Sequence, residues 1–216
     1  NHLTADCCAM ALVSWKTARI TRKGVELLER GDWLNDEVIT FWLEYFSTAA
    51  PPDGLGKPED VVILDTVVAN WMLSEDDPED LQDGLEPWEL PKKRLILVPL
   101  ADREDKGAEG YQGTHWALLA LQRHGEELRG SYYDSMGTAN LPLAQRLTEK
   151  LAPGVKIEVA AAGKQQNASD CGIFTLLFTE ALCRDKDPKD VTQAQAEAAR
   201  KHMASHIWRL AKKAEG

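Results

Sequence analysis

The most constraining feature of this sequence is the segment Cys171–Cys183 (CGIFTLLFTEALC), which is almost entirely apolar and carries one charged residue, Glu180. Such a segment predicts a helix with no face for water, so other parts of the chain have to enclose it. A chain of 216 residues and 24.0 kDa is long enough to build one core of this kind. We therefore expect residues 1–216 to form a single domain around this helix.

Amphipathic helices and short strands are predicted around the central helix. From Val38 to Phe46 apolar residues recur at helical spacing, and Asn35-Asp36 supplies an N-cap just before them. Beyond Pro91 the chain changes to short apolar runs, which are typical of sheet strands. Helices, then strands, then helices predict an α+β fold. The expected strands are Arg94–Ala101, Trp116–Leu121, Leu128–Tyr133 and Val155–Ala161, the expected further helices are Leu143–Leu151 and Val191–Lys212, and Glu75–Asp80 is expected to be an acidic surface loop.

The charge balance bears on which partners the chain binds. It contains 25 Lys and Arg against 35 Asp and Glu, a formal net charge of −10. Proteins that bind the phosphate backbone of nucleic acids carry clustered basic residues, so this class is disfavoured. Partners with a basic face are favoured.

Cysteine usage and hydropathy bear on location. Four cysteines are too few for a disulfide scaffold, and Cys7 and Cys8 are adjacent and poorly placed to bridge each other. No run approaches the roughly 18 to 20 apolar residues that cross a bilayer, and the first residues do not resemble a signal peptide. We expect a soluble protein without a membrane partner, in the reducing environment of the cytoplasm or nucleus. Secretion as a bacterial effector is the alternative.

Cys171 has the surroundings that a nucleophilic cysteine needs. Ser169-Asp170 precede it and the predicted helix begins at it. Its sulfur would then lie at the positive end of the helix dipole, which stabilises a negative charge by roughly 0.3–2 kcal/mol. Gly172 leaves the backbone open to a substrate. The alternative is that Cys171 is one more small apolar residue at the start of a buried helix.

His115 and Asp134 are candidates for a base and its orienting acid. His115 stands at the mouth of an apolar strand, where a polar side chain has little packing reason to be. Asp134 ends the next strand, so antiparallel pairing brings both residues to one end of a hairpin. There the carboxylate would accept the imidazole Nδ1–H and stabilise the imidazolium. An ordinary strand-edge histidine and a turn aspartate are the alternatives.

Thiol catalysis also needs donors for the oxygen that becomes negative in the tetrahedral intermediate. The backbone N–H of Cys171 and a side-chain amide just upstream are candidates. Gln165, Gln166 and Asn167 all offer such an amide, and the alternative is that they form an ordinary polar loop.

Four short motifs occur in order along the chain: Trp33-Leu34-Asn35-Asp36, His115-Trp116, Tyr133-Asp134-Ser135 and Gln165–Gly172. Together they resemble the sentrin/SUMO-specific proteases, cysteine proteases that act on ubiquitin-like proteins. The resemblance runs from about Trp15 to the end of the chain. It implies a papain-like fold with the permuted order His, Asp, Cys, in which helices pack a central mixed sheet and the catalytic cysteine begins a buried helix.

The resemblance implies a role for each candidate residue. Cys171 is the implied nucleophile, His115 the general base and acid, Asp134 the orienting carboxylate, and Gln165 the oxyanion-hole amide. No metal and no cofactor is implied.

The resemblance also implies a substrate tunnel. Trp33 and Trp116 would close over an extended Gly-Gly tail, which glycine alone can thread because it has no Cβ. The alternative for each tryptophan is packing in the core. Further substrate-binding residues implied by the motifs are Asn35, Asp36, Gly113 and Thr114.

Within the family the likeness is closest to the deneddylases, which act on the neddylation modifier of cullins. The shared segments are Leu85–Pro91, Gly113–Leu119 and Thr179–Cys183, although Gln112-Gly113 stands where deneddylases have paired glycines. The implied protein is a monomeric thiol isopeptidase and processing protease for that modifier, with cullins among its possible conjugated substrates. The alternatives are a SUMO- or ubiquitin-specific protease, an acetyltransferase of the same clan, and a non-catalytic modifier-binding module.

Overall fold

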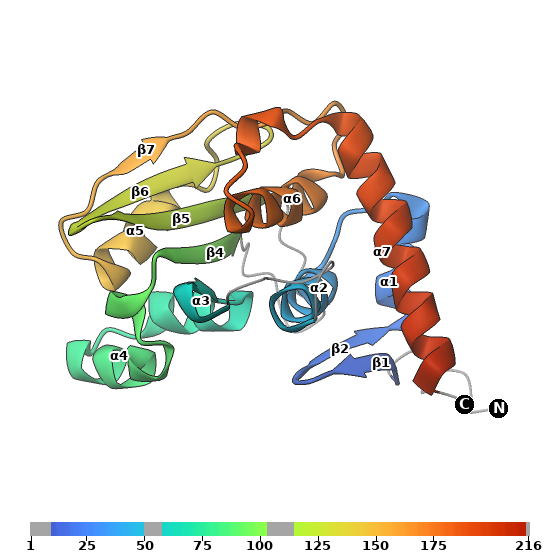
Figure 1. The fold of residues 1–216 in the computed structure, drawn as a ribbon, viewed down its shortest axis with the longest axis horizontal. Helices are drawn as coiled ribbons and strands as arrows, with labels where there is room; N and C mark the ends of the chain where they lie inside the picture. Colours follow the sequence, from blue (N-terminus) through green and yellow to red (C-terminus); the bar gives the residue numbers. More distant parts are fainter. Residues whose placement is uncertain (1–9, 50–57, 103–114, 215–216) are drawn as a thin grey trace.

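The computed structural model describes residues 10–49, 58–102 and 115–214, and Figure 1 shows a sheet beside a group of helices. In chain order the elements are β1 (Ala11–Trp15), β2 (Ala18–Thr21), α1 (Arg22–Arg30), α2 (Asp36–Thr48), η1 (Pro58–Asp60), β3 (Val61–Ile63), α3 (Thr66–Ser74), α4 (Pro78–Leu85), η2 (Glu86–Trp88), η3 (Leu90–Lys92), β4 (Leu95–Ala101), β5 (Trp116–His124), β6 (Glu127–Tyr133), α5 (Leu141–Leu151), β7 (Ile157–Val159), α6 (Cys171–Cys183), η4 (Pro188–Asp190) and α7 (Gln193–Ala214).

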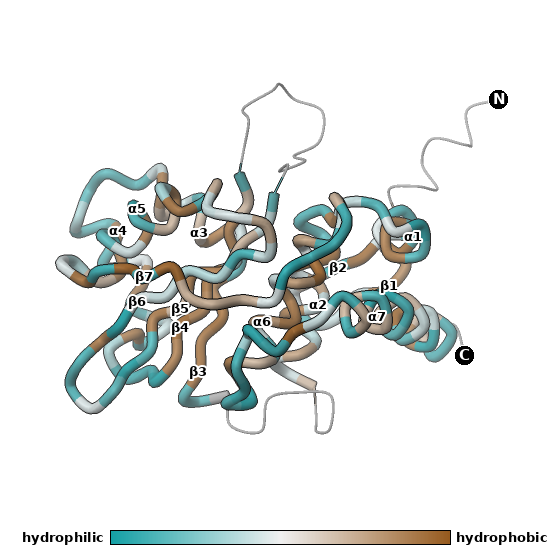
Figure 2. Tube along the Cα trace, turned by 90° about the horizontal axis from the view of Figure 1, so that it is seen from above, coloured by the Kyte–Doolittle hydropathy of each residue, from teal (hydrophilic) through white to brown (hydrophobic). Residues whose placement is uncertain are grey.

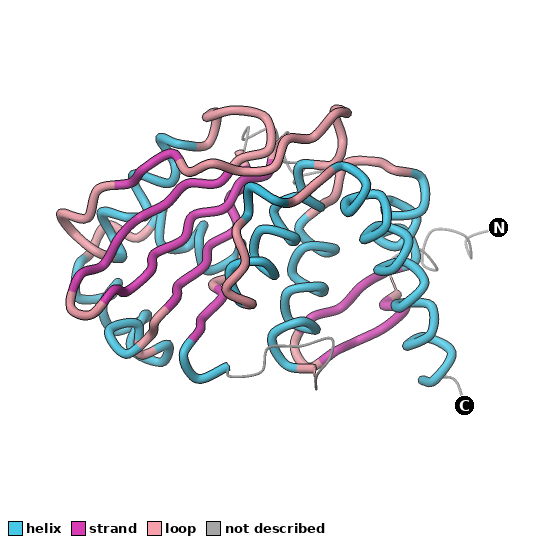
Figure 3. The backbone as a smooth tube through the Cα atoms, turned by 45° about the horizontal axis from the view of Figure 1, so that its top comes forward, coloured by secondary structure: helices cyan, strands magenta, loops and turns pink. Residues whose placement is uncertain are grey.

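The main sheet has five strands in the order β3-β4-β5-β6-β7. The outer pairs, β3–β4 and β6–β7, are parallel, and the inner pairs, β4–β5 and β5–β6, are antiparallel. Figure 3 shows these strands side by side with helices on both sides of them. The predicted mixed sheet packed by helices is therefore confirmed.

Alternate residues of the central strands point into two cores. Leu97 and Leu118 belong to a cluster that includes residues of α2, α6 and α7. Val98 and Leu119, their neighbours along the strands, belong to a second cluster with residues of α3 and α5. Because both faces are covered, β4 and β5 are hydrophobic runs rather than alternating ones, as the colours of Figure 2 show for β4.

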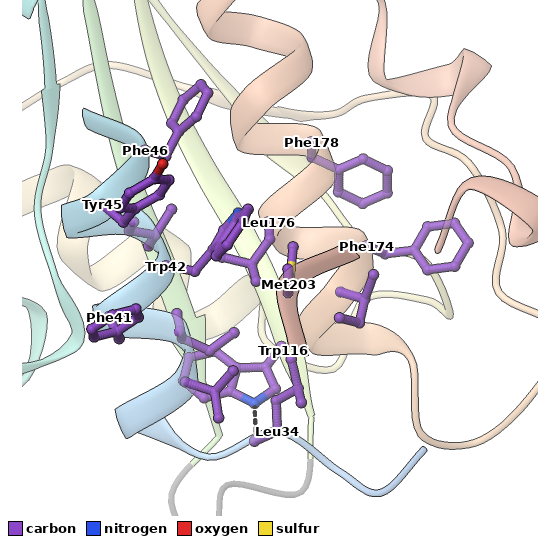
Figure 4. Packing of buried hydrophobic residues seen from close by; sticks show 14 of the residues in the cluster. Leu34, Phe41, Trp42, Tyr45, Phe46, Trp116, Phe174, Leu176, Phe178 and Met203 are labelled. Atoms are coloured by element: carbon purple, nitrogen blue, oxygen red, sulfur yellow. Dashed lines mark hydrogen bonds between the residues drawn. The ribbon is translucent and has the colours of Figure 1, made fainter. Parts of the chain in front are cut away.

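The helix α6 spans the segment that we predicted, from Cys171 to Cys183, and lies inside the first core. Its Phe174 and Phe178 are fully buried, with ring centroids 5.8 Å apart. Figure 4 shows these rings with Leu176 beside Trp42 of α2 and Met203 of α7. The central helix is thus enclosed by the sheet, an earlier helix and the last helix.

The predicted helix after Asn35 is also present. Asn35 Oδ1 accepts a hydrogen bond from the backbone N–H of Val38 at 3.2 Å, and α2 runs from Asp36 to Thr48. β4 to β6, α5 and α7 lie within a few residues of their expected positions, β5 continues to His124, and β7 is shorter than expected at Ile157–Val159. β7 is an edge strand whose residues are largely exposed, so little packing extends it.

The predicted order of helices, then strands, then helices is wrong at the start of the described chain. The hairpin β1–β2 comes first, and its Val13, Ala18 and Ile20 join the first core. β1 does not alternate between apolar and polar residues, and the alternation of β2 extends over only four residues, so the hairpin gives a weak strand signal.

The acidic segment Glu75–Asp80 is only partly a loop, because α4 begins inside it at Pro78. Asp77 Oδ1 accepts from the backbone N–H of Glu79 at 2.8 Å, so this segment contains an aspartate N-cap followed by proline at the first helical position. We interpreted the dense acidic charge as a loop and therefore missed the start of α4.

Within the described ranges, no helix combines the length and the apolar character that a transmembrane span requires.

Candidate active site

His115 and Asp134 lie at the same end of the β5–β6 hairpin, as we expected. The antiparallel register pairs Leu118 with Tyr133, so the residue before β5 and the residue after β6 meet at one edge of the sheet. His115 Nε2 lies 2.9 Å from Oδ1 and 2.9 Å from Oδ2 of Asp134. The two residues are 8% and 3% exposed, so they form a buried polar pair.

The nitrogen that faces Asp134 differs from the prediction. We expected Nδ1 to donate to the carboxylate, and the structure places Nε2 there. Strand register determines where a histidine lies but not the rotation of its ring, so the sequence could not distinguish the two nitrogens. With Nε2 on the carboxylate, Nδ1 is the ring nitrogen left for the Cys171 thiol.

Cys171 occupies the first position of α6 and is 2% exposed. It lies close enough to His115 for the two side chains to interact electrostatically. Burial lowers the pKa of His115, but the interactions with Asp134 and Cys171 outweigh burial and raise the pKa to about 10. His115 therefore carries a proton at neutral pH. Burial alone would fit an apolar cysteine at a helix start, whereas a charged imidazole beside it would not.

The carboxylate of Asp134 is held by donors from three directions. Tyr132 Oη donates to Oδ2 at 2.6 Å, and the backbone N–H groups of Met136 and Gly137 donate to Oδ1 at 2.7 and 3.0 Å. Burial raises the pKa of Asp134, and the hydrogen bonds from His115, Tyr132, Gly137 and Met136 outweigh burial and lower it to about 2. The carboxylate is therefore charged and fixed in orientation.

Tyr132 and Asn140 complete this arrangement, and sequence reasoning missed both. The backbone N–H of Asn140 donates to Tyr132 Oη at 3.2 Å, and Asn140 Nδ2 donates to the carbonyl oxygen of His115 at 3.1 Å. Tyr132 occupies an ordinary strand position and Asn140 begins a helix, so neither residue type signals a site on its own.

Among the three amides predicted for the oxyanion, Gln165 is the one bonded to Ser135, the residue after Asp134. Its Oε1 accepts from Ser135 Oγ at 2.5 Å, and its Nε2 donates to the carbonyl oxygen of Asn167 at 2.6 Å. The Nε2 group has a second hydrogen, so it can donate once more. Asn167 is engaged differently, because its Nδ2 donates to Asp170 at 2.8 Å.

The two tryptophans of the predicted tunnel have different surroundings. Trp33 is 46% exposed, and its Nε1 donates to the carbonyl oxygen of Ala168, just before Cys171, at 2.7 Å. Trp116 is 2% exposed, and its Nε1 donates to the carbonyl oxygen of Leu34 at 2.8 Å, as Figure 4 shows. Trp33 therefore presents its indole at the surface beside the segment that leads to Cys171, while Trp116 packs in the first core.

Of the four other predicted substrate-binding residues, two lie at the start of α2 and two lie outside the described residues. Asn35 caps α2, and Asp36 is the first residue of that helix. Gly113 and Thr114 lie outside the described residues.

Comparison with protein families gives one match across most of the chain. The C-terminal catalytic domain of the Ulp1 protease family matches residues 32–213. Sentrin-specific protease 8 of Homo sapiens is 30% identical over 181 residues, which cover 81% of this chain and 82% of that protein. NEDD8-specific protease 1 of Arabidopsis thaliana is 27% identical and the alignment covers 80% of this chain and 75% of that protein.

Comparison with solved structures gives the same fold. The C-terminal Ulp1 protease domain in complex with SMT3, the yeast ortholog of SUMO, superimposes with a TM-score of 0.70 at 19% identity, covering 94% of this chain and 88% of that one. The Xanthomonas campestris effector protein XopD bound to ubiquitin superimposes with a TM-score of 0.58 at 18% identity, covering 81% and 91%.

Proposed function

This chain belongs to the Ulp1 family of cysteine proteases, which act on ubiquitin-like modifiers, and we propose that it cleaves after the C-terminal Gly-Gly of the neddylation modifier NEDD8. The observation that carries the proposed chemistry is the buried, hydrogen-bonded pair of His115 and Asp134, with Cys171 close enough to interact with the imidazole. The proposed choice of modifier is supported by similarity to a protease named for NEDD8.

Catalysis begins with a proton already on His115. The His115 pKa of about 10 keeps the ring charged at neutral pH. In the proposed mechanism this imidazolium is the counterion of the thiolate with which Cys171 attacks. The thiolate attacks the carbonyl carbon of the terminal glycine, and a sulfur–carbon bond forms as the carbonyl oxygen takes up a negative charge. The backbone N–H of Cys171 and Gln165 Nε2 donate to that oxygen.

Collapse of this intermediate breaks the bond to the leaving nitrogen. His115 Nδ1 gives its proton to that nitrogen, which leaves as the lysine side chain of a conjugate or as the amine end of a precursor extension. Water, deprotonated by the now neutral His115, then attacks the thioester and releases the modifier acid. Asp134 remains charged throughout, because its pKa of about 2 lies far below neutral pH.

Trp33 supplies the proposed selection for glycine. Its exposed indole lies beside the segment that leads into Cys171, held there through Ala168. A tail without Cβ atoms can pass close to a flat indole, whereas a larger residue would collide with it.

We extend the proposal to cullin conjugates as substrates and to a monomeric enzyme in a reducing compartment. A free thiolate at Cys171 is the only cysteine form that performs this chemistry, and reducing conditions preserve it.

The test is a set of modifiers carrying a C-terminal electrophile, and fluorogenic substrates ending in NEDD8, SUMO and ubiquitin. We expect an adduct with the NEDD8 probe that Cys171→Ala abolishes and the matched variant Cys183→Ala retains. We also expect the highest kcat/KM on the NEDD8 substrate. An adduct that survives Cys171→Ala would refute the nucleophile, and equal rates on all three substrates would refute the specificity.

A further inference from the structure

Asp170, the residue before Cys171, stands at the N-cap position of α6 but does not cap it. Its side chain accepts no hydrogen bond from the first turn of that helix. Oδ1 accepts from Arg200 Nε at 2.6 Å, and Oδ2 accepts from Asn167 Nδ2 at 2.8 Å and from Gln193 Nε2 at 2.7 Å. Asp170 and Arg200 are 2% and 6% exposed, so this is a buried ion pair.

Arg200 joins three segments through one planar group. Besides the bond to Asp170, its Nη2 donates to the carbonyl oxygen of Ser169 at 2.9 Å and its Nη1 to the carbonyl oxygen of Leu27 in α1 at 3.1 Å. A guanidinium presents these donors in a fixed fork, which a lysine ammonium cannot reproduce.

The segment leading to Cys171 is held from α7 at a second point as well. Gln193 Oε1 accepts from the backbone N–H of Gln166 at 2.9 Å. Within the segment, Asn167 Oδ1 accepts from the backbone N–H groups of Ser169 and Asp170 at 3.2 and 3.0 Å. Side chains of α7 therefore define the path of the chain that carries the proposed oxyanion donor toward the nucleophile.

We propose that Arg200, acting through Asp170, is a positioning residue for the Cys171 thiolate. The proposal rests on the proposed role of Cys171. Arg200 turns the Asp170 carboxylate away from α6, so the first N–H groups of the helix stay available to the negative sulfur and to the oxyanion. It also neutralises a carboxylate that would otherwise repel the thiolate of the next residue. The charge on Asp170 is maintained, because burial raises its pKa while hydrogen bonds from Arg200, Asn167 and Gln193 lower it by more.

A purely stabilising role would not need charges here. Replacing a buried ion pair with apolar residues of similar volume is often neutral or favourable for stability. The pair is better explained by what it does to the geometry and charge beside Cys171.

The experiment compares Arg200→Lys and Gln193→Ala with Lys201→Gln, a matched control that removes one charge from an exposed neighbour on the same helix. The first measurement is the rate of iodoacetamide labelling at Cys171, followed by peptide mass spectrometry between pH 6 and 9. The second is kcat and KM on the fluorogenic modifier substrate, and thermal melting confirms folding.

For Arg200→Lys we expect labelling of Cys171 to slow by about tenfold at pH 7, with the profile displaced to higher pH, because the fork contacts are lost. We expect kcat to fall by a similar factor and KM to change by less than about twofold, since no modifier-binding residue is altered. Gln193→Ala removes two hydrogen bonds from a partly exposed residue and should slow labelling by about threefold. Lys201→Gln should match the parent protein.

The proposal would be overturned if Arg200→Lys is folded, has its Cys171 labelled at the parent rate and has the kcat of the parent protein. If Arg200→Lys does not fold, Gln193→Ala is the deciding variant. Labelling of Cys171 at the parent rate in Gln193→Ala would then overturn the proposal. Labelling needs no modifier, so slowed labelling in a protein that cleaves no modifier would refute the proposed function and leave the positioning role supported.

Discussion

Replacing Tyr132 by phenylalanine removes a single oxygen atom from the support of Asp134. The Tyr132 hydroxyl donates to Asp134 Oδ2 at 2.6 Å and accepts from the backbone N–H of Asn140 at 3.2 Å, and the side chain is fully buried. The ring keeps its packing in the second core, so polar contacts are the main change.

The cost can be worked from these two contacts. A hydrogen bond to a charged group contributes about 1.5–3 kcal/mol, and a buried N–H left without its acceptor costs about 1–3 kcal/mol. We expect the free energy of unfolding at pH 7 to fall by about 3 kcal/mol and the melting temperature to fall by about 6–12 °C in a chain of this length.

The loss of stability in Tyr132→Phe depends on pH, because it depends on the charge of Asp134. Its pKa is about 2 in the folded protein against an ordinary 3.8, so its charged form stabilises the fold above pH 3.8 and this stability is lost as pH falls through about 2. The fall in pKa corresponds to about 2–3 kcal/mol. Because the Tyr132 hydroxyl is one cause of that fall, the difference between variant and parent should be full at pH 7 and shrink below about pH 4.

The assay is urea denaturation of parent and variant at pH 7 and pH 3, with kcat measured at pH 7. His115 and the N–H groups of Met136 and Gly137 still hold Asp134 in the variant, so kcat should fall by less than about tenfold. Tyr133→Phe, which removes the hydroxyl of the neighbouring buried tyrosine in the first core, is the matched control and should lose less stability. A loss below about 1 kcal/mol at pH 7, or a loss that is larger at pH 3 than at pH 7, would refute the reasoning.

Three further predictions follow from single residues. Burial raises the pKa of Cys183 to about 12, whereas Cys171, although also buried, lies beside the charged His115. Iodoacetamide at pH 8 should therefore modify Cys171 and leave Cys183 unmodified, and comparable labelling of both would contradict the assignment. Trp33→Ala should raise KM several-fold on modifier substrates and cost under about 1 kcal/mol of stability, because the indole is half exposed with one hydrogen bond, and an unchanged KM would exclude substrate contact. Gly163→Ala should lower the free energy of unfolding by more than about 3 kcal/mol in urea titrations, because a Cβ there would lie 1.9 Å from the carbonyl oxygen of Val191. Gly137→Ala is the control, since there is open space around the Cβ position of Gly137. Equal losses in the two variants would contradict the prediction.

The parts of the fold that could be predicted are those with strong local patterns. The unbroken apolar segment of α6 and the helical spacing after Asn35 leave one interpretation each, so α6 and α2 were found with their bounds nearly right. The hairpin β1–β2 has no such pattern and is stabilised by packing against helices from elsewhere in the chain. Local sequence does not contain that information.

The candidate site could also be predicted only in part. The meeting of His115 with Asp134 follows from a hairpin of short connection, so it was accessible from sequence. The orientation of the His115 ring depends on a side-chain torsion, and the contact between Asp170 and Arg200 depends on how α7 packs against α1. Arg200 also lies in an alanine-rich helix among exposed charges, where nothing in the sequence distinguishes it from its neighbours.

The ion pair between Asp170 and Arg200 has a consequence for the order in which the protein is made. Synthesis proceeds from the N-terminus, so His115, Asp134 and Cys171 all exist as linked residues before Arg200 has been added. Until then the Asp170 carboxylate has no buried cation to meet, and the segment before the nucleophile lacks its anchor in the last helix. On the proposed role of Arg200, a nascent chain carries the three proposed catalytic residues before the contacts that position Cys171 can form, and cleavage would begin only after α7 has been added.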